Sequence, residues 1–130
     1  MTLNTVVAEL LAAFPELKPV CDEEFDFYGD QPLDPYPVFA TVFRRAVFDA
    51  IDKGDDEFLK RAFAFYERMA TDPDERVGTL MGIELIEDVA NDQRRLRISW
   101  PYMGEQTKRE ARAYASAVKR QFGKDVPLPE

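Results

Sequence analysis

The sequence predicts an all-α fold, a single domain of about five helices that spans residues 1–130. In five segments, apolar side chains recur at the i, i+3 and i+4 spacing of an amphipathic helix. Proline, glycine and aspartate stand where these segments begin and end, as helix breakers and caps do. A chain of this length can bury one core, and its 10 Phe, 5 Tyr and 1 Trp supply bulky side chains for it.

The first helix is expected at about residues 5–14, where apolar residues share one face and Pro15 ends the run. Residues 15–34 then break the pattern with prolines, acids and aromatic rings. We expect an acidic, aromatic loop there, with a short irregular helix at 20–27 as the alternative. Loops of this length in a compact domain are usually functional or disordered.

The second and third helices are expected at about 35–53 and 56–70, each led by an aspartate that can cap its first turn. The connection between them is short, and Gly54 suits the position that follows a helix C-terminus. A short connection places two helices side by side in opposite directions. These two helices are therefore predicted to form an antiparallel hairpin.

A fourth helix is expected at about 72–91 and a fifth at about 106–122. Residues 93–104 between them are expected to form an irregular connection that is basic and aromatic, because proline and glycine punctuate them. Residues 124–130 contain two prolines and are expected to be a loose tail.

The arrangement of these helices has two interpretations. Residues 65–72 resemble residues 85–92 at an offset of 20, which is typical of stacked helical repeats. The antiparallel hairpins are therefore expected to form either a helical bundle or a short HEAT-like stack.

The residue types exclude the common histidine- and cysteine-based centres. The chain has no histidine and a single cysteine, Cys21, which removes His-based triads, His-ligated metals and an internal disulfide. Three acids, Asp22 to Glu24, follow Cys21, and their charge disfavours a reactive thiolate. We assign no catalytic residue, no cofactor and no metal site, and expect no enzymatic activity.

Charge is distributed unevenly along the chain, whose net charge is −8. Residues 1–92 hold 21 acids and 8 bases, whereas residues 93–130 hold 4 acids and 9 bases. The acidic part would repel nucleic acid and anionic lipid and would attract a basic protein, although acidity that only favours solubility explains the same composition. Because the sequence shows no signal-peptide pattern and no membrane-length apolar stretch, we expect a cytoplasmic location.

The first of three candidate contact surfaces lies on the fourth helix. Glu84, Glu87 and Asp88 share one helix face, and Val77 and Leu80 are expected to be exposed beside them. Acids that border exposed aliphatic residues suit a basic partner. The same spacing also suits a divalent cation or an acid–base pair, and a solvated face is the simplest alternative.

The second candidate is the acidic loop, whose rings and carboxylates could imitate nucleic acid, enter a basic active site, or simply tuck under the loop. Its candidate contact residues are Asp22, Glu23, Glu24, Phe25, Asp26 and Tyr28.

The third candidate is the basic and aromatic connection, which offers Arg97, Trp100 and Tyr102, of types that are enriched at interface hot spots. Alternatively, Trp100 and Tyr102 fix the connection to the core. The overall acidity disfavours binding of single-stranded nucleic acid there.

Several short runs resemble a family of small bacterial helical domains of unknown function that occur among the immunity proteins of polymorphic toxin systems. The likeness covers roughly residues 36–115 and rests on Val38–Phe43, Gly54-Asp55, Phe65–Met69, Val77, Leu85–Glu87 and Tyr102–Gly104. It implies a cytoplasmic inhibitor that binds its cognate toxin tightly and needs no cofactor. The acidic N-terminal region and the basic last helix depart from the family's pattern.

We therefore expect a protein-binding module, most simply an immunity protein. It would bind a basic domain of its cognate bacterial toxin and thereby neutralise the toxin. The alternatives are a carboxylate-dependent enzyme, with or without a metal, and a self-associating structural subunit. No nucleic-acid or membrane partner is expected, and the sequence does not indicate an oligomeric state.

Overall fold

The computed structural model describes all 130 residues and confirms the all-α class, with 76% helix and no strand. It contains seven helices where about five were expected, when helical segments that continue without a break are counted together. The segments are α1 (Val6–Ala13), η1 (Pro15–Leu17), α2 (Lys18–Glu24), η2 (Asp26–Tyr28), α3 (Pro35–Val38), η3 (Phe39–Phe43), α4 (Arg44–Lys53), α5 (Asp56–Ala70), α6 (Glu75–Met81), η4 (Gly82–Ile86), α7 (Glu87–Ala90), α8 (Gln93–Ser99), η5 (Trp100–Tyr102) and α9 (Glu105–Phe122).

The two additional helices lie in segments that were expected to be irregular. Residues 15–34 contain α2, and residues 93–104 contain α8. Pro15 and Pro19 fall in the first turns of η1 and α2, where the backbone N–H that proline lacks is not needed for the helix. The second segment is capped by Asp92, whose side chain accepts a hydrogen bond from the backbone N–H of Arg95 at 3.1 Å.

Two of the long helices contain a π-helical turn. One turn, η3, joins α3 to α4, and the other, η4, joins α6 to α7. A π-helical turn inserts one extra residue, so the buried side of each helix moves by one position after the turn. The two turns contact each other, and each is therefore part of the interface between its helix and the other.

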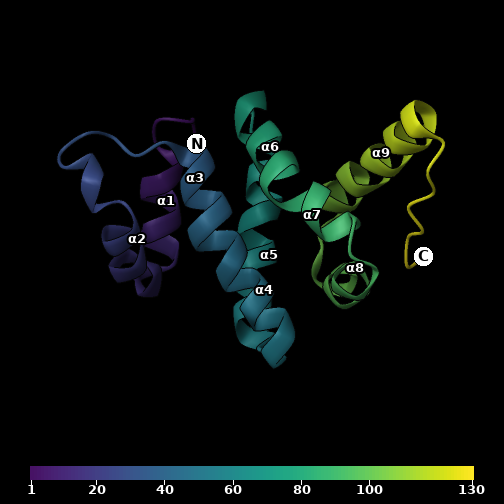
Figure 1. The fold of residues 1–130 in the computed structure, drawn as a ribbon, viewed down its shortest axis with the longest axis horizontal. Coiled ribbons are helices and arrows are strands. Elements are labelled where there is room, and N and C mark those ends of the chain that lie inside the picture. The colour runs from purple at the N-terminus through teal and green to yellow at the C-terminus, as the bar shows by residue number, and fades with distance from the viewer.

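The core is a continuous cluster of 29 buried residues that runs through the whole row of helices. α5 lies at its centre and contacts α4, α6 and α9 (Figure 1). Phe14, Phe43 and Phe65 meet edge to face or tilted, with ring centroids 5.1–6.0 Å apart, and Phe43 stacks on Tyr66. α1 and α2 lie at one end of the row, and α8 and α9 lie at the other (Figure 1).

None of the helices is both long enough and apolar enough to cross a membrane. α9 is the longest purely α-helical segment, but charged side chains recur along its length.

Candidate functional site

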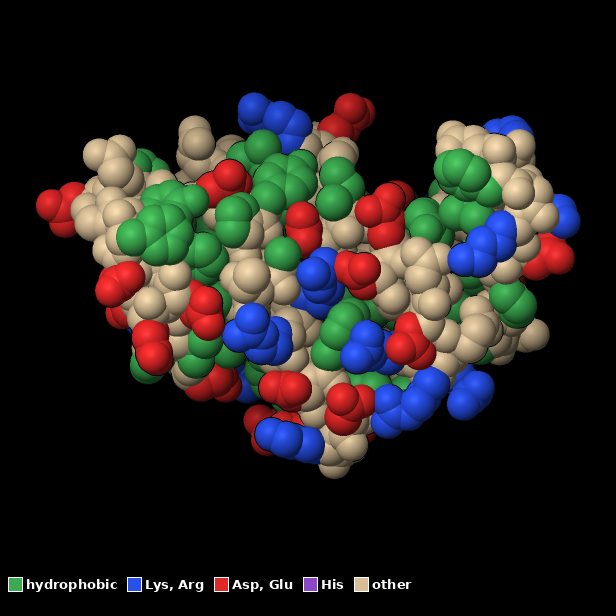
Figure 2. Space-filling view, in the orientation of Figure 1, with side chains coloured by type: hydrophobic (Ala, Val, Ile, Leu, Met, Phe, Trp, Pro, Cys, Tyr) green, Lys and Arg blue, Asp and Glu red, His purple; other side chains and the backbone are tan.

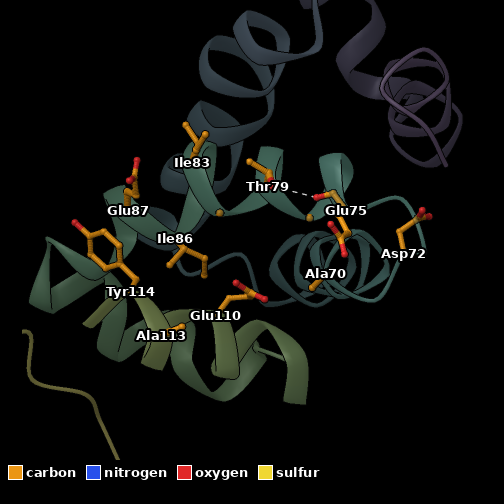
Figure 3. Close-up of a pocket in the computed structure, with 12 residues that line it drawn as sticks. Ala70, Asp72, Glu75, Thr79, Ile83, Ile86, Glu87, Glu110, Ala113 and Tyr114 are labelled. Carbon is orange, nitrogen blue, oxygen red and sulfur yellow. Dashed lines mark hydrogen bonds between the residues drawn. The ribbon is translucent and has the colours of Figure 1, made fainter. Parts of the chain in front are cut away.

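A cleft of about 490 Å³ lies between the continuous helix α6–η4–α7 and the helix α9 (Figures 2 and 3). Its volume is in the range of roughly 300–1,000 Å³ that is typical of ligand sites. The lining positions on each helix are three or four residues apart, so they form one helix face. They are Glu75, Gly78, Thr79, Gly82, Ile83, Ile86 and Glu87 on the first helix and Glu110, Ala113 and Tyr114 on α9, with Ala70 and Asp72 at one end.

Two glycines leave room in this cleft. A methyl group added to Gly82 would meet nothing within 4 Å, and one added to Gly78 would come no closer than 3.8 Å to the carbonyl oxygen of Met69. Neither glycine is therefore required by close packing or by an unusual backbone conformation. Because larger side chains at these two positions would project into the cleft, glycine keeps the cleft open.

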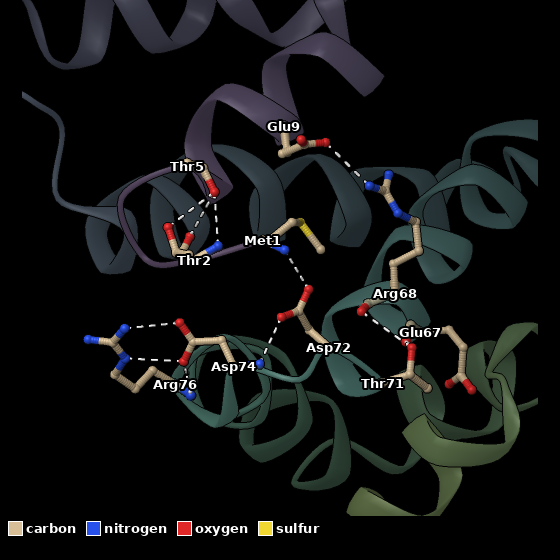
Figure 4. A network of polar contacts seen from close by, with 10 residues as sticks. All are labelled: Met1, Thr2, Thr5, Glu9, Glu67, Arg68, Thr71, Asp72, Asp74 and Arg76. Carbon is tan, nitrogen blue, oxygen red and sulfur yellow. Dashed lines mark hydrogen bonds and ion pairs between the residues drawn. The ribbon is translucent and has the colours of Figure 1, made fainter.

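The cleft is acidic: four of its lining residues are carboxylates and none is basic. One of the four, Asp72, is satisfied within the chain. Its carboxylate accepts hydrogen bonds from the amino group of Met1 at 2.7 Å and from the backbone N–H of Asp74 at 2.9 Å (Figure 4). These two bonds hold the pKa of Asp72 below its ordinary value.

The other three carboxylates are available to a ligand. The side chains of Glu75 and Glu87 form no hydrogen bond or ion pair, and Glu110 accepts only one hydrogen bond, from the amide of Gln106 at 3.2 Å. The hydroxyl of Tyr114 accepts a hydrogen bond from Asn91 at 2.8 Å, so its own proton remains free to be donated.

An apolar wall accompanies these acids. The side chain of Ile86 is buried beneath the cleft, whereas Ile83 is 42% exposed at its edge. Figure 3 shows both isoleucines on the helix that faces Glu110 and Tyr114. A concave surface with an aliphatic wall and unpaired carboxylates suits a cation that is carried on an apolar stem, as in lysine and arginine.

Of the three acids that were predicted to act together, the structure separates one from the others. Glu84 and Asp88 both pair with Arg44 of α4, and the distance from Arg44 Nη1 to Glu84 Oε2 is 3.3 Å. Only Glu87 faces the cleft. Burial raises the pKa of Glu84, although the charge of Arg44 acts in the opposite direction. No three carboxylates come together in an arrangement that could hold a metal ion.

The prediction that Val77 and Leu80 are exposed beside these acids is wrong. Both side chains are completely buried and belong to the core cluster. The cause is the π-helical turn η4, which the sequence pattern did not reveal. In the presence of the extra residue, the buried side of the helix continues from Val77 and Leu80 to Leu85 and Ile86, while Ile83 turns outward.

The acidic segment forms α2 and η2, so it contains the short helix that was the alternative to a loop, at residues 18–24 rather than 20–27. Its acids are exposed, but Lys18 pairs with Asp22 and Arg45 pairs with Glu24. Phe25 is buried in the core and Tyr28 is half-buried against it. The exposed aromatic residue is instead their neighbour Phe27, whose side chain is 75% exposed; the other proposed acids, Glu23 and Asp26, are exposed as well.

The third predicted surface has mainly structural contacts. Trp100 is buried, and Lys108 and Arg112 lie over its ring. The hydroxyl of Tyr102 donates a hydrogen bond to Asp56 at 2.6 Å. Arg97 is exposed at the edge of a second cavity of about 730 Å³, which has acidic and basic residues in its lining.

The sequence interpretation missed most of the residues that line the acidic cleft. It did not single out Glu75, Ile83, Glu110 or Tyr114. One usable signal was present: Gly78 and Gly82 are four residues apart inside a helix, where glycine is unfavourable unless a close approach or an open space requires it. The α9 half of the cleft had no such local signal, because its place opposite α6 depends on tertiary packing.

No curated protein and no solved structure matches the chain. Residues 7–120 match the model of a family that is described as Domain of unknown function (DUF7674). The matched region extends from the first turn of α1 to the last turn of α9 and includes every residue of the acidic cleft. Since the match covers most of the chain, the protein belongs to this family of unknown function.

Proposed function

We propose that the chain is a protein-binding module whose acidic cleft receives a basic side chain of its partner. The supporting observation is a cavity of about 490 Å³ that contains four carboxylates, no basic residue and a partly exposed aliphatic wall. The carboxylates of Glu75 and Glu87 have no partner in the chain, and a lysine or arginine of another protein would supply one.

The physical basis of this binding is the difference between a carboxylate that already has an ion-pair partner in the chain and one that has none. A carboxylate that is already held by a neighbouring arginine, as Asp88 is by Arg44, gains little from a second cation. An unpaired carboxylate in a partly enclosed cleft gains a charge-assisted hydrogen bond. The aliphatic stem of the incoming residue would lie on Ile83 and Ile86, which removes apolar surface from water.

A basic toxin domain is the partner that we propose to test first. The proposal rests on the acidity of the cleft and on the resemblance of residues 36–115 to small helical domains of unknown function, members of which occur among immunity proteins. Inhibition of this kind requires complementary charge and shape and no chemistry on the part of the inhibitor.

The cleft is tested with a fluorescein-labelled hexa-arginine peptide, whose binding is followed by fluorescence anisotropy at 0.15 M salt. We expect Glu75→Gln and Glu87→Gln each to weaken binding by about three- to tenfold, because each removes one charge-assisted contact. Glu57→Gln is the matched control, since Glu57 is an exposed acid outside the cleft. An equal loss in the control would mean that only general acidity attracts the peptide.

Neutralisation is tested separately: the products of the neighbouring genes are expressed in cells, and a product that stops growth is co-expressed with this chain. The native chain is expected to restore growth, and the double variant Glu75→Lys/Glu87→Lys is expected not to. Glu57→Lys changes the charge in the same direction outside the cleft and should leave protection unchanged. Full protection by the double variant would remove the cleft from the inhibitory contact.

A further inference from the structure

The chain turns back along α9 after that helix ends. Gly123 takes a left-handed conformation, with φ of 65°, at the end of the helix. Residues 124–130 then run beside α9 without secondary structure (Figure 1). Asp125 pairs with Lys119 at 2.9 Å, and Glu130 pairs with Arg112.

The contact between this segment and α9 is loose. A cavity of about 810 Å³ separates them, and Leu128 is the one apolar side chain of the segment that packs against the core cluster. Both ion pairs are exposed to solvent, where such pairs contribute little to stability. The family match ends at residue 120, so the segment lies outside the region that the family shares.

The segment also leaves most of the basic charge of α9 unmatched. It contains two acids and one lysine, Lys124. Lys108, Arg109 and Arg120 on α9 have no ion-pair partner, although Lys108 lies over the ring of Trp100. A ligand with more carboxylates than residues 124–130 would therefore match this helix face better than the chain's own segment does.

We propose that the face of α9 between Arg112 and Arg120 binds an acidic, proline-containing extended segment of a partner protein, and that residues 124–130 occupy this site in the isolated chain. The chain's own segment shows the mode of binding: carboxylates reach Arg112 and Lys119, and the residues between them, Val126 to Pro129, have no secondary structure, with Val126, Pro127 and Leu128 facing the helix across the cavity. Proline-rich extended segments lose little conformational entropy when they bind.

The chain's own segment is a weak competitor that is present at high local concentration. A short tether of a few residues gives an effective concentration on the order of millimolar. A partner segment must bind tightly enough to displace the chain's own segment. Additional carboxylates that reach Arg109 or Arg120 would supply the extra affinity. This site is on the outer face of α9 and shares no lining residue with the acidic cleft, so the proposal stands independently of the proposed function.

The test uses the full chain and a labelled peptide that copies residues 124–130 but carries Glu in place of Lys124. The variant Asp125→Asn/Glu130→Gln removes both ion pairs and should release the chain's own segment. We expect it to bind the peptide about three- to tenfold more tightly than the native chain, as loss of two exposed ion pairs from the competitor implies. The emission of Trp100, the single tryptophan, should change on binding because Arg112 lies over its ring.

Adding Arg112→Gln or Lys119→Gln to the released variant should remove this gain, whereas Lys53→Gln, an exposed cation at the end of α4, should not. Equal affinity of the native chain and the released variant would overturn the proposal. It would also be overturned if neither Arg112→Gln nor Lys119→Gln changed the affinity of the released variant for the peptide. Concentration-dependent dimers of the released variant that exclude the peptide would assign the site to a second copy of the chain instead.

Discussion

The carboxylate of Glu67, on α5, caps the first turn of α9 through three hydrogen bonds. Its Oε1 accepts from the backbone N–H and from the hydroxyl of Thr107, both at 2.8 Å, and its Oε2 accepts from the backbone N–H of Gln106 at 3.0 Å. The residue at the cap position of α9 is Gly104, which has no side chain to do this. An acid from the central helix therefore satisfies the unpaired N–H groups and the positive dipole end of α9.

We predict that Glu67→Ala lowers the free energy of unfolding by about 2 kcal/mol, because it leaves two backbone N–H groups and the hydroxyl of buried Thr107 without an acceptor. The measurement is urea unfolding followed by circular dichroism. Glu57→Ala, an exposed acid in the first turn of the same helix, is the control and should lower the free energy by less than about 1 kcal/mol, which is the most that the helix dipole contributes there. A similar effect in both variants would mean that the cap contributes nothing specific.

The cap also makes a prediction about pH. Burial by itself would raise the pKa of Glu67, but the hydrogen bonds from Thr107 and Gln106 outweigh it and hold the pKa below its ordinary value. A carboxyl whose pKa is lower in the folded state stabilises that state above its unfolded pKa of about 4.3. The stabilisation is lost as the pH falls through the lower folded value. The difference in stability between the native chain and Glu67→Ala should therefore be constant from pH 7 to about 5 and shrink below about 4; a constant difference down to pH 2 would contradict this.

Gly104 has the complementary prediction. A methyl group at this position would lie 2.3 Å from Cδ of Glu67, although the backbone conformation, with φ of −74°, suits any residue. We expect Gly104→Ala to destabilise the native chain by an amount similar to Glu67→Ala, because the methyl group displaces the capping carboxylate. The two changes should not add. In the Glu67→Ala background, Gly104→Ala should change the free energy of unfolding by less than about 0.5 kcal/mol, and full additivity would rule out the clash as the cause.

These contacts illustrate which features of the fold the sequence predicted. Helix ends with a local cause were found: Asp34 and Asp55 cap α3 and α5, and Gly54 takes the left-handed conformation after α4. The Glu67 cap could not be found in this way, because its carboxylate and Thr107 are 40 residues apart. It depends on the packing of α5 against α9, for which no local pattern exists.

The π-helical turn η4 is the second feature that the local sequence pattern did not reveal, and it made part of the predicted site wrong. An ideal helix periodicity places Val77 and Leu80 at the surface and Ile83 in the apolar arc, and the inserted residue reverses both assignments. Glu87 was the one predicted contact residue that lies in the acidic cleft. The rest of the cleft follows from the direction in which α9 leaves η5, which is a tertiary property.

A further prediction concerns Glu84, which is held between η4 and Arg44. Burial raises its pKa more than the charge of Arg44 lowers it, so the ionised side chain destabilises the fold at neutral pH. Glutamine has the same side-chain shape as glutamate but no charge, and Arg44 retains Asp88 as an ion-pair partner. We therefore expect Glu84→Gln to increase the free energy of unfolding at pH 7 by less than about 1 kcal/mol. Because a raised carboxyl pKa removes stability as the pH rises through it, this gain should vanish below about pH 4. A loss of more than about 1 kcal/mol at pH 7 would show that the pair with Arg44 dominates.

The last prediction concerns Cys21, the single thiol of the chain, which is completely buried in α2. Burial raises the pKa of this thiol, and the charge of Asp22 raises it further, so thiolate is scarce at neutral pH. We expect labelling of Cys21 by iodoacetamide at pH 7.5 to be limited by unfolding and to accelerate with urea in parallel with the loss of helix measured by circular dichroism. The reference rate is that of the chain unfolded in urea. Cys21 and Phe25 are buried in the same cluster as residues of α5, so α2 is expected to open only when the core does. If the labelling rate of the native chain greatly exceeds the rate expected from global unfolding, α2 opens separately from the core.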